Sequence, residues 1–372
     1  MHRPRRLAAF AALSTLSTLV GAFSCSQFRD ASIAPVTDAG GDTPEVETSP
    51  ADAGSPFTVV QGLPGGEALA AVWGADPDDV FAVGTNDVHY EYYQGSWQRS
   101  QSVIGRDLAA VWGTSASDVY AVGIDNTSGG GVIEHFDGTA WTDDAITPTA
   151  LYGVWGTGDA ILAVGAEGMI YGKHTGIPGW TMVLGEAGLP ANPDVPSAPG
   201  EPILWGIAGT SITAFAMPAD LDRIFQVVNA GGFVNLDPAV DRTISFRSVF
   251  SVPGGTGSYF FGTNYFGVTW LTANAPADAA VLGGDMSLIF QDRSAMGADQ
   301  LFIYGIWGTA DRFLFTGDQG RIYTYAAGID QFGPVASPTD ATLYGVWGSS
   351  ASDVWIVGQR EVILHGALPT GG

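Results

Sequence analysis

Residues 108–123 read LAAVWGTSASDVYAVG. The first six place Leu108, Ala110 and Trp112 on one face of a strand, since successive side chains of a strand point to opposite faces. The following SASD segment is typical of a turn, because an Asp side chain can accept hydrogen bonds from the backbone that follows it. The segment VYAVG is again typical of a strand. Residues 108–123 therefore predict two short strands joined by a tight turn.

The same pattern returns along the chain. Five copies keep Trp at the fifth position, and two copies in the middle replace it with Ala or Phe. The anchor positions are Trp73, Trp112, Trp155, Ala208, Phe250, Trp307 and Trp347. A strand-rich repeat of roughly 40 residues has the size of one four-stranded propeller blade.

The two ends of the repeated region complement each other. The last copy has three strands, and Phe57-Thr-Val-Val60 is an unassigned strand before the first copy. That strand can complete the last blade and leave no open sheet edge. We therefore predict an all-β fold, a seven-bladed β-propeller of four-stranded blades over residues 57–366. The ring is closed by an N-terminal strand, and residues 367–372 form a C-terminal tail. An open six-bladed or partly degenerate ring is the alternative, because the fourth and fifth copies are eroded.

The N-terminus has the features of an export signal. Basic residues precede an apolar run over 7–23, and small residues lead to Cys25, the single cysteine. This order predicts a signal peptide over 1–24. The run AFSC resembles a bacterial lipobox, which implies lipidation of Cys25 and a membrane contact through the lipid anchor only. The alternative is ordinary cleavage that leaves Cys25 as a free thiol.

The segment 25–56 is rich in Pro, Ala, Asp, Gly, Ser and Thr and poor in aromatic residues, which predicts an acidic flexible tether. We expect an exported lipoprotein at the outer membrane or cell surface. A periplasmic or secreted protein is the alternative. The formal net charge of −24, from 38 acidic and 14 basic residues, disfavours binding to nucleic acid.

The complete repeat pattern is VWG, then DVxxVG, then DGxxW. Residues 111–113, 118–123 and 137–141 contain it. It resembles the repeats of exported bacterial lipoproteins with BNR-like or kelch-like propellers. The resemblance implies the architecture and leaves the activity open, because propellers host many unrelated functions.

Catalytic and metal-binding patterns are not evident. A sialidase would need several converging arginines, and Arg242 and Arg247 are the closest pair in a scattered set. His135 and His365 occupy similar third-strand positions, which favours a structural role. Acidic residues near position 76 are expected to cap a turn. We therefore expect no enzyme activity, no cofactor and no metal.

Alternate connections of a propeller share one face. The long connections 124–131, 185–202 and 272–300 are expected on that face, where elaborated loops usually bind ligands. The candidate binding residues are Asp125, Asn126, Trp270 and Asp285. We expect a monomeric, non-enzymatic cell-envelope scaffold that binds an envelope protein or a glycan. A lectin-like propeller and a degenerate sialidase-like glycoside hydrolase are the alternatives.

Overall fold

A computed structural model describes the chain from Gly54 onward, with gaps. The described residues are 54–64, 66–101, 105–157, 160–174, 176–184, 303–309, 311–326 and 331–369, together with the backbone of the strands between 204 and 290. The expected signal peptide, Cys25 and most of the tether lie outside these residues. No helix in the described part is long and apolar enough to cross a bilayer.

The described elements are short β-strands and three single-turn 3₁₀ segments. The strands are β1 (Phe57–Val59), β2 (Leu69–Asp76), β3 (Asp79–Gly84), β4 (Val88–Tyr93), β5 (Ser96–Gln101), β6 (Arg106–Ser115), β7 (Asp118–Asp125), β8 (Gly131–Phe136), β9 (Trp141–Thr147), β10 (Leu151–Thr157), β11 (Ala160–Gly165), β12 (Ile170–His174), β13 (Thr181–Leu184), β14 (Leu204–Gly209), β15 (Ala214–Pro218), β16 (Ile224–Val228), β17 (Gly232–Leu236), β18 (Ser245–Ser251), β19 (Gly257–Asn264), β20 (Gly267–Asn274), β21 (Met286–Phe290), β22 (Ile303–Gly308), β23 (Arg312–Gly317), β24 (Ile322–Ala326), β25 (Gln331–Val335), β26 (Leu343–Ser350), β27 (Asp353–Gly358) and β28 (Ile363–Gly366). The 3₁₀ segments are η2 (Ala166–Gly168), η5 (Asp318–Gly320) and η6 (Gln359–Glu361).

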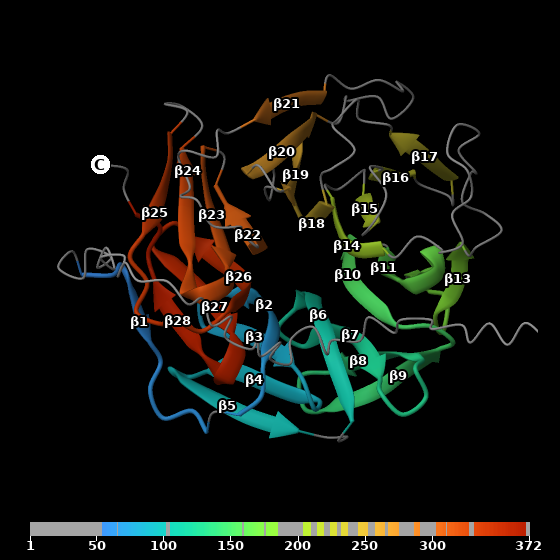
Figure 1. Ribbon diagram of the computed structural model, residues 1–372. Helices are drawn as coiled ribbons and strands as arrows, with labels where there is room; N and C mark the ends of the chain where they lie inside the picture. Colours follow the sequence, from blue (N-terminus) through green and yellow to red (C-terminus); the bar gives the residue numbers. More distant parts are fainter. Residues whose placement is uncertain are drawn as a thin grey trace, which may run out of the picture.

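These strands form four-stranded antiparallel sheets. The sheets are β2–β5, β6–β9, β10–β13, β14–β17, β18–β21, β22–β25 and β1 with β28, β27 and β26. They follow one another around a common centre in chain order, which is a β-propeller arrangement (Figure 1). The inner strand of each sheet contacts the inner strand of the next.

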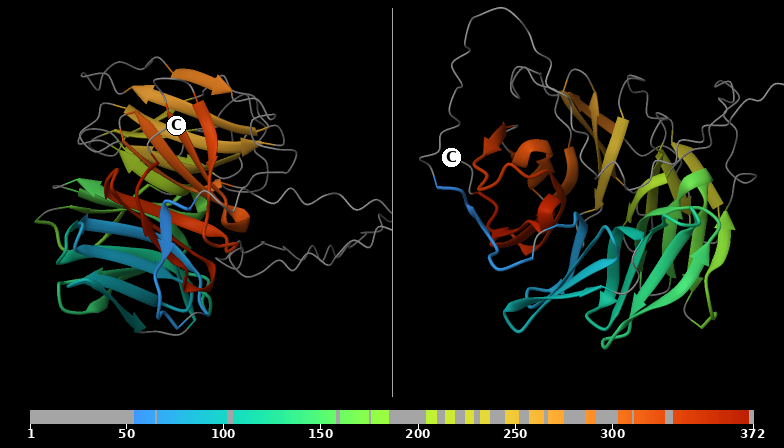
Figure 2. Two further views of the ribbon diagram at one scale, coloured as in Figure 1. Left: turned by 90° about the vertical axis from the view of Figure 1, so that its left-hand side faces the viewer. Right: turned by 60° about the horizontal axis from the view of Figure 1, so that its bottom comes forward.

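The first strand of the chain pairs with the last. Phe57 lies opposite Gly366 and Val59 opposite Leu364, so β1 is the outer strand of the sheet that holds the end of the chain. Figure 2 shows β1 beside β28 from two further directions. The hydroxyl of Ser55 also donates a hydrogen bond of 2.7 Å to the carbonyl of Ala336.

The structure differs from the sequence prediction within 272–300. This range was expected to be one long connection, but β20 extends to Asn274 and β21 covers Met286–Phe290. Apolar residues at positions 286, 288 and 290 give this segment a strand pattern that the loop assignment overlooked. The expected loop 185–202 lies outside the described residues.

The glycine at the end of the DVxxVG pattern fits a close backbone approach. In the sheet β6–β9, a Cβ on Gly123 would lie 2.1 Å from the carbonyl oxygen of Asp107. The register of β6 against β7 shifts here, between Leu108 and Ala110, because β6 contains a bulge. The same close approach recurs at Gly84, Gly165 and Gly358. Any side chain at these positions would collide with backbone.

The glycine of the VWG pattern is required for a different reason, which is contact with a side chain of the preceding sheet. A Cβ on Gly113 would lie 2.8 Å from the ring of Trp73, which belongs to the preceding sheet. Gly74 meets the ring of Trp347 in the same way, at 2.5 Å. Each such Trp therefore places its six-membered ring against the glycine of the next repeat. The contact explains why Trp and Gly occur together in the pattern.

The apolar core lies between sheets. One cluster of buried residues joins Leu69, Val80 and Tyr90 of the first sheet to Trp355 and Ile363 of the last. The next cluster joins Phe81 and Val83 to Leu108 and Val119 of the second sheet. Both faces of an inner strand are consequently buried, as in a stack of packed sheets.

We predict that Gly123→Ala lowers the free energy of unfolding by about 1–3 kcal/mol, because the added methyl group forces the bulge apart. Gly333→Ala is the matched control, since a Cβ there has no heavy atom within 4 Å. It should change stability by less than about 0.5 kcal/mol. Urea denaturation of both variants measures the difference. Equal effects of the two substitutions would contradict the close-approach explanation.

Candidate functional site

Tight turns join the second and third strands at one end of the sheets. In four of them, two successive residues have left-handed φ angles: Asn86 and Asp87, Glu167 and Gly168, Gln319 and Gly320, and Arg360 and Glu361. The second position is glycine in two turns and a carboxylate in the other two. A non-glycine residue there costs about 1 kcal/mol or more. Asp87 and Glu361 accept this conformation, and both are buried.

The carboxylate of Glu361 crosses from the last sheet to the first. The Tyr90 hydroxyl donates a hydrogen bond of 3.0 Å to one oxygen, and Arg99 Nε donates one of 3.1 Å to the other. Burial, followed by the nearby Glu361 charge, raises the pKa of Tyr90 above its usual range. The buried charge is thus matched by an arginine and by a hydroxyl that stays protonated.

The carboxylate of Asp87 faces the boundary between the first and second sheets. Glu134 in β8 occupies the position that Tyr90 has in β4, since the two residues lie opposite Ala121 and Ala82, which correspond in the repeat. His89 is the third member. Oxygen or nitrogen atoms of Asp87, His89 and Glu134 all lie within 4.8 Å of one another, and all three residues are buried.

Glu134 has two further contacts that fix its orientation. Its Oε2 lies 2.8 Å from His89 Nε2, and its Oε1 accepts a hydrogen bond of 2.9 Å from Arg106 Nη1. Arg106 also binds both oxygens of Asp143, at 2.5 and 2.9 Å. The His89 ring stacks on Trp141 at 4.5 Å between centroids. Only Asp143 of this group is widely exposed, at 51% of its side chain.

Burial raises the pKa of the Glu134 carboxyl, and the nearby Asp87 adds to the rise, while the His89 hydrogen bond opposes it. The hydrogen bonds from Arg106 hold the pKa of Asp143 below its usual range. Arg106 has its own pKa raised, first by Asp143 and also by Glu134, against the effect of burial. Among the described residues, the cluster is a group of largely buried acids bonded to the permanent cation Arg106.

A polar rim continues from this cluster along the same end of the sheets. The buried Asp107 accepts hydrogen bonds from Asn86 N at 3.0 Å and from Asn126 Nδ2 at 2.8 Å. Glu67 accepts one from Asn86 Nδ2 at 2.9 Å and one from Thr85 Oγ1 at 3.0 Å. These bonds hold the turns against the first strands of their own and the next sheet.

The binding residues predicted from the sequence do not meet in one place that the structure describes. Asp125 caps its own turn, with Oδ1 accepting from Thr127 N at 2.8 Å, and backbone hydrogen bonds lower its pKa. Asn126 is held by Asp107. Trp270 lies in β20, opposite Phe261. Asp285 lies outside the described residues.

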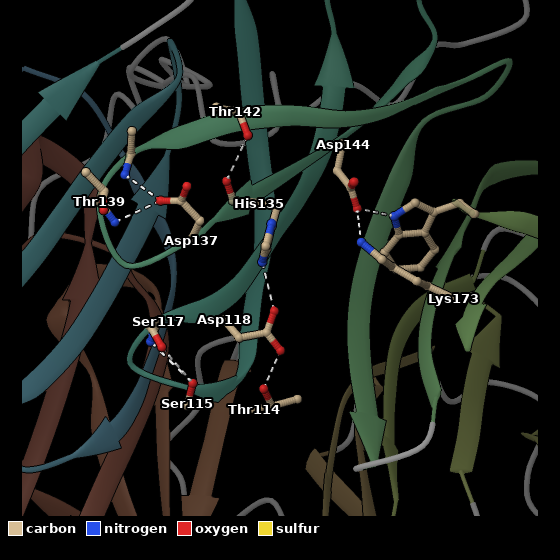
Figure 3. Close-up of polar contacts among 12 residues, drawn as sticks. Thr114, Ser115, Ser117, Asp118, His135, Asp137, Thr139, Thr142, Asp144 and Lys173 are labelled. Atoms are coloured by element: carbon tan, nitrogen blue, oxygen red, sulfur yellow. Dashed lines mark hydrogen bonds and ion pairs between the residues drawn. The ribbon is translucent and has the colours of Figure 1, made fainter. Parts of the chain in front are cut away.

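The two histidines at matching positions have matching contacts. His135 Nε2 lies 2.8 Å from Asp118 Oδ1, and the Thr114 hydroxyl donates to the same carboxylate (Figure 3). His365 pairs with Asp353 at 2.7 Å in the last sheet. Both rings stack on an aromatic side chain of β7 or β27. This arrangement agrees with the structural role expected from the sequence.

The arginines needed for a carboxylate clasp do not converge among the residues whose side chains are described. Each is bonded to a different partner. The pairs are Arg99 with Glu361, Arg106 with Glu134 and Asp143, Arg312 with the carbonyl of Pro369, Arg321 with Asp318, and Arg360 with Asp340. Of the two arginines that the sequence singled out, Arg247 lies in β18 and Arg242 lies outside the described residues.

Sequence reasoning overlooked the cluster of Asp87, His89 and Glu134. Asp87 and His89 are neighbours in the chain, but Glu134 follows His89 by 45 residues and belongs to the next sheet. Aligning the third strands would have revealed it, because the repeat places the acid Glu134 where the first repeat has Tyr90, and the polar His89 where other copies have Ile133 or Ile363. Polar residues at buried repeat positions are the signal.

Comparisons with known proteins define the fold only. No protein-family model matches the sequence, and no curated protein matches it. Among solved structures, the chain is similar to YCF48 from Cyanidioschyzon merolae, with 14% identity, a TM-score of 0.65, and coverage of 84% of this chain and 98% of that one. A structure of YCF48 bound to D1 peptide gives 12% identity, a TM-score of 0.61, and coverage of 84% and 97%.

Two further structures have the same architecture. Virginiamycin B lyase from Staphylococcus aureus gives 10% identity, a TM-score of 0.63, and coverage of 84% of this chain and 99% of that one. The WD40 β-propeller domain of Doa1 gives 12% identity, a TM-score of 0.56, and coverage of 83% of this chain and 94% of that one. These structural similarities establish a β-propeller fold. At identities this low they say nothing about the activity of this chain.

We predict that Tyr90→Phe lowers the free energy of unfolding by about 1–3 kcal/mol, because the buried Glu361 carboxylate loses the hydrogen bond that the Tyr90 hydroxyl donates. Tyr92→Phe is the matched control. Tyr92 packs against Trp97 and Trp355, and its hydroxyl has no hydrogen bond among the described residues. Its loss should cost less than about 0.5 kcal/mol. Chemical denaturation compares the two, and a silent Tyr90→Phe would show that the bond to Glu361 contributes nothing.

Proposed function

We propose that the protein is a non-enzymatic binding scaffold, built as a closed ring of seven four-stranded blades, that presents one rim to a basic polypeptide partner. The closed ring is supported by contacts between the first strands of successive sheets, including β26 with β2. The contact of Trp347 with Gly74 repeats there the packing of Trp73 on Gly113. A ring without a free edge gives its loops a fixed geometry.

The observation that carries this proposal is the acidic character of the rim. The end of the sheets that holds the turns between second and third strands also holds the starts of the first strands. Carboxylates that are at least partly exposed lie along it, at Glu67, Asp125, Glu167, Asp318 and Asp340. Among the described residues, Arg321 and Arg360 are paired with the last two, which leaves the first three in excess.

A net charge of −24 makes the protein negative overall, which would attract a basic partner over a distance. The partner class is supported by the similar structure of YCF48, which was solved with a peptide. The absence of catalysis is proposed because each described arginine is already bonded to a different group. The similarity to a lyase is one of fold.

Export and anchoring belong to the same proposal. A basic N-terminus, an apolar run and a lone cysteine predict a signal peptide followed by lipidation of Cys25. The acidic segment up to residue 56 would hold the propeller away from the membrane. The rim would then face a partner in the cell envelope or at the cell surface.

We expect the full-length protein to bind lysine- and arginine-rich peptides in a synthetic library in preference to acidic peptides of equal length, with affinity falling as salt is raised. Glu167→Lys on the rim should weaken this binding by about twofold to fivefold, since it reverses one exposed charge. Asp78→Lys is the matched control. It makes the same charge change in the exposed turn between β2 and β3, at the opposite end of the sheets.

A glycan array and a panel of glycosidase substrates are run beside the peptide library. Glycan binding without peptide binding would replace the proposal with a lectin-like function. Turnover of any substrate would refute the non-enzymatic assignment. An equal loss of peptide binding in the two lysine variants would show that the partner responds to net charge and not to this rim.

We expect Cys25→Ser to abolish incorporation of a radiolabelled fatty acid in a bacterial host and to release the protein from the membrane fraction. The unchanged sequence should be labelled and sediment with membranes. Labelling that survives the substitution would show that the anchor lies elsewhere, and an unlabelled original protein would favour simple secretion.

A further inference from the structure

The same type of turn places a buried carboxylate at two sheet boundaries, and the groups that surround this carboxylate differ between them. At the boundary between the last and first sheets, Glu361 is neutralised by Arg99 and by the hydroxyl of Tyr90. At the next boundary, Asp87 occupies the same turn position, but the residue in the place of Tyr90 is another acid, Glu134. The second boundary thus brings two buried carboxylates together where the first has one.

The second boundary holds more buried acid than the first. Arg106 is shared between Glu134 and Asp143, and it binds both oxygens of Asp143. Its single charge therefore offsets only part of the charge of the two acids that it bonds. Asp87 is fully buried and Glu134 is 1% exposed, so water screens these carboxylates poorly. A bound cation would stabilise such a group.

We propose that Asp87, His89 and Glu134 bind a first-row divalent cation of the Zn²⁺ or Mn²⁺ class. The three ligand atoms lie within 4.8 Å of one another, close enough to surround one ion. The separation of 2.8 Å between His89 Nε2 and Glu134 Oε2 suits two ligands of one metal. Ligands at about 2.1 Å from a metal are roughly 3.0 Å apart at right angles and roughly 3.4 Å apart in the tetrahedral geometry of zinc, so a small opening of this pair would admit the ion.

The kinds of ligand select the metal. An imidazole nitrogen with two carboxylates suits zinc, manganese or iron, whereas calcium and magnesium prefer oxygen ligands alone. The other nitrogen, His89 Nδ1, is buried without a hydrogen-bond partner among the described residues. Since no acceptor in the described part of the chain fixes the tautomer, the proton can reside on Nδ1 and leave Nε2 for the metal.

The surroundings resemble the outer shell of a metal site. Arg106 binds the Glu134 oxygen that faces away from His89, and Trp141 stacks on the His89 ring. Such contacts orient ligands before the ion arrives. Asp87 and His89 come from the first sheet and Glu134 from the second. The bound ion would join the two sheets, whatever partner the rim binds.

The test measures metal content and affinity on the purified full-length protein after treatment with a chelator. Isothermal titration with Zn²⁺ and Mn²⁺, with elemental analysis, should give one tightly bound ion, and thermal unfolding should shift upward on addition. Ca²⁺ and Mg²⁺ should give neither effect. Asp87→Asn, His89→Ile and Glu134→Gln should each weaken binding by about tenfold or more.

Glu134→Tyr guards against a variant that merely fails to fold. It copies the balanced boundary, where Tyr90 meets the carboxylate of Glu361, so it should fold and lose the ion. Glu361→Gln is the matched control and should keep one ion. Absence of binding by the original protein would overturn the proposal. Zn²⁺ binding that survives in folded Glu134→Tyr would overturn it as well, because the ion would then be elsewhere.

Discussion

The stacking of one tryptophan on the glycine of the following repeat sets the spacing of the sheets. Gly113 has no room for a Cβ beside Trp73, and Gly74 has none beside Trp347. The glycine at the end of the second strand imposes a second limit, because it admits the backbone of the first strand at a bulge. The first contact limits the distance between neighbouring sheets, the second limits the pairing of the first two strands within a sheet, and side chains elsewhere must adapt to both.

The polar groups at the sheet boundaries show this adaptation. The turns at residues 86–87 and 360–361 have the same left-handed backbone conformation, so residues 87 and 361 place their carboxylates at corresponding positions toward the next sheet. What each carboxylate meets is then decided by one position of the neighbouring third strand. Tyr90 there gives a neutral hydrogen-bonded boundary, and Glu134 gives a charged one. Local composition changes the electrostatics while the geometry stays constant.

The architecture was predictable because the same residues make the same packing contacts in most copies of the repeat. Trp with Gly, and Val-Gly after Asp-Val, recur wherever the same contacts recur, and the predicted repeats appear as four-stranded sheets. The buried cluster was not predictable from spacing, because Asp87, His89 and Glu134 come together only when two sheets are packed. Position 285 and the loop 185–202 were chosen for length and polarity, and they lie outside the described residues.

The segment β21 was misread for a related reason. This strand has only five residues. Its alternation of apolar and polar side chains is therefore a weaker signal than that of the tryptophan-containing strands. Asp125 and Asn126 were chosen as ligands because they lie in an elaborated connection. In the structure their polar atoms are used to build the turn and to hold it against Asp107. A polar loop residue commonly satisfies its own backbone first.

The pairing of β1 with β28 has a consequence for how the chain folds. The Thr58 hydroxyl donates to the carbonyl of His365 across a sequence separation of 307 residues. The earlier sheets are made of consecutive strands and can form as the chain emerges, but this one must wait for the last residues. Contacts between residues so far apart in the sequence slow folding. The chain loses conformational entropy when the long loop closes, before the strand gains its hydrogen bonds. The final sheet is therefore the last to be completed, and β28 presents an open edge to other unfinished chains until β1 pairs with it.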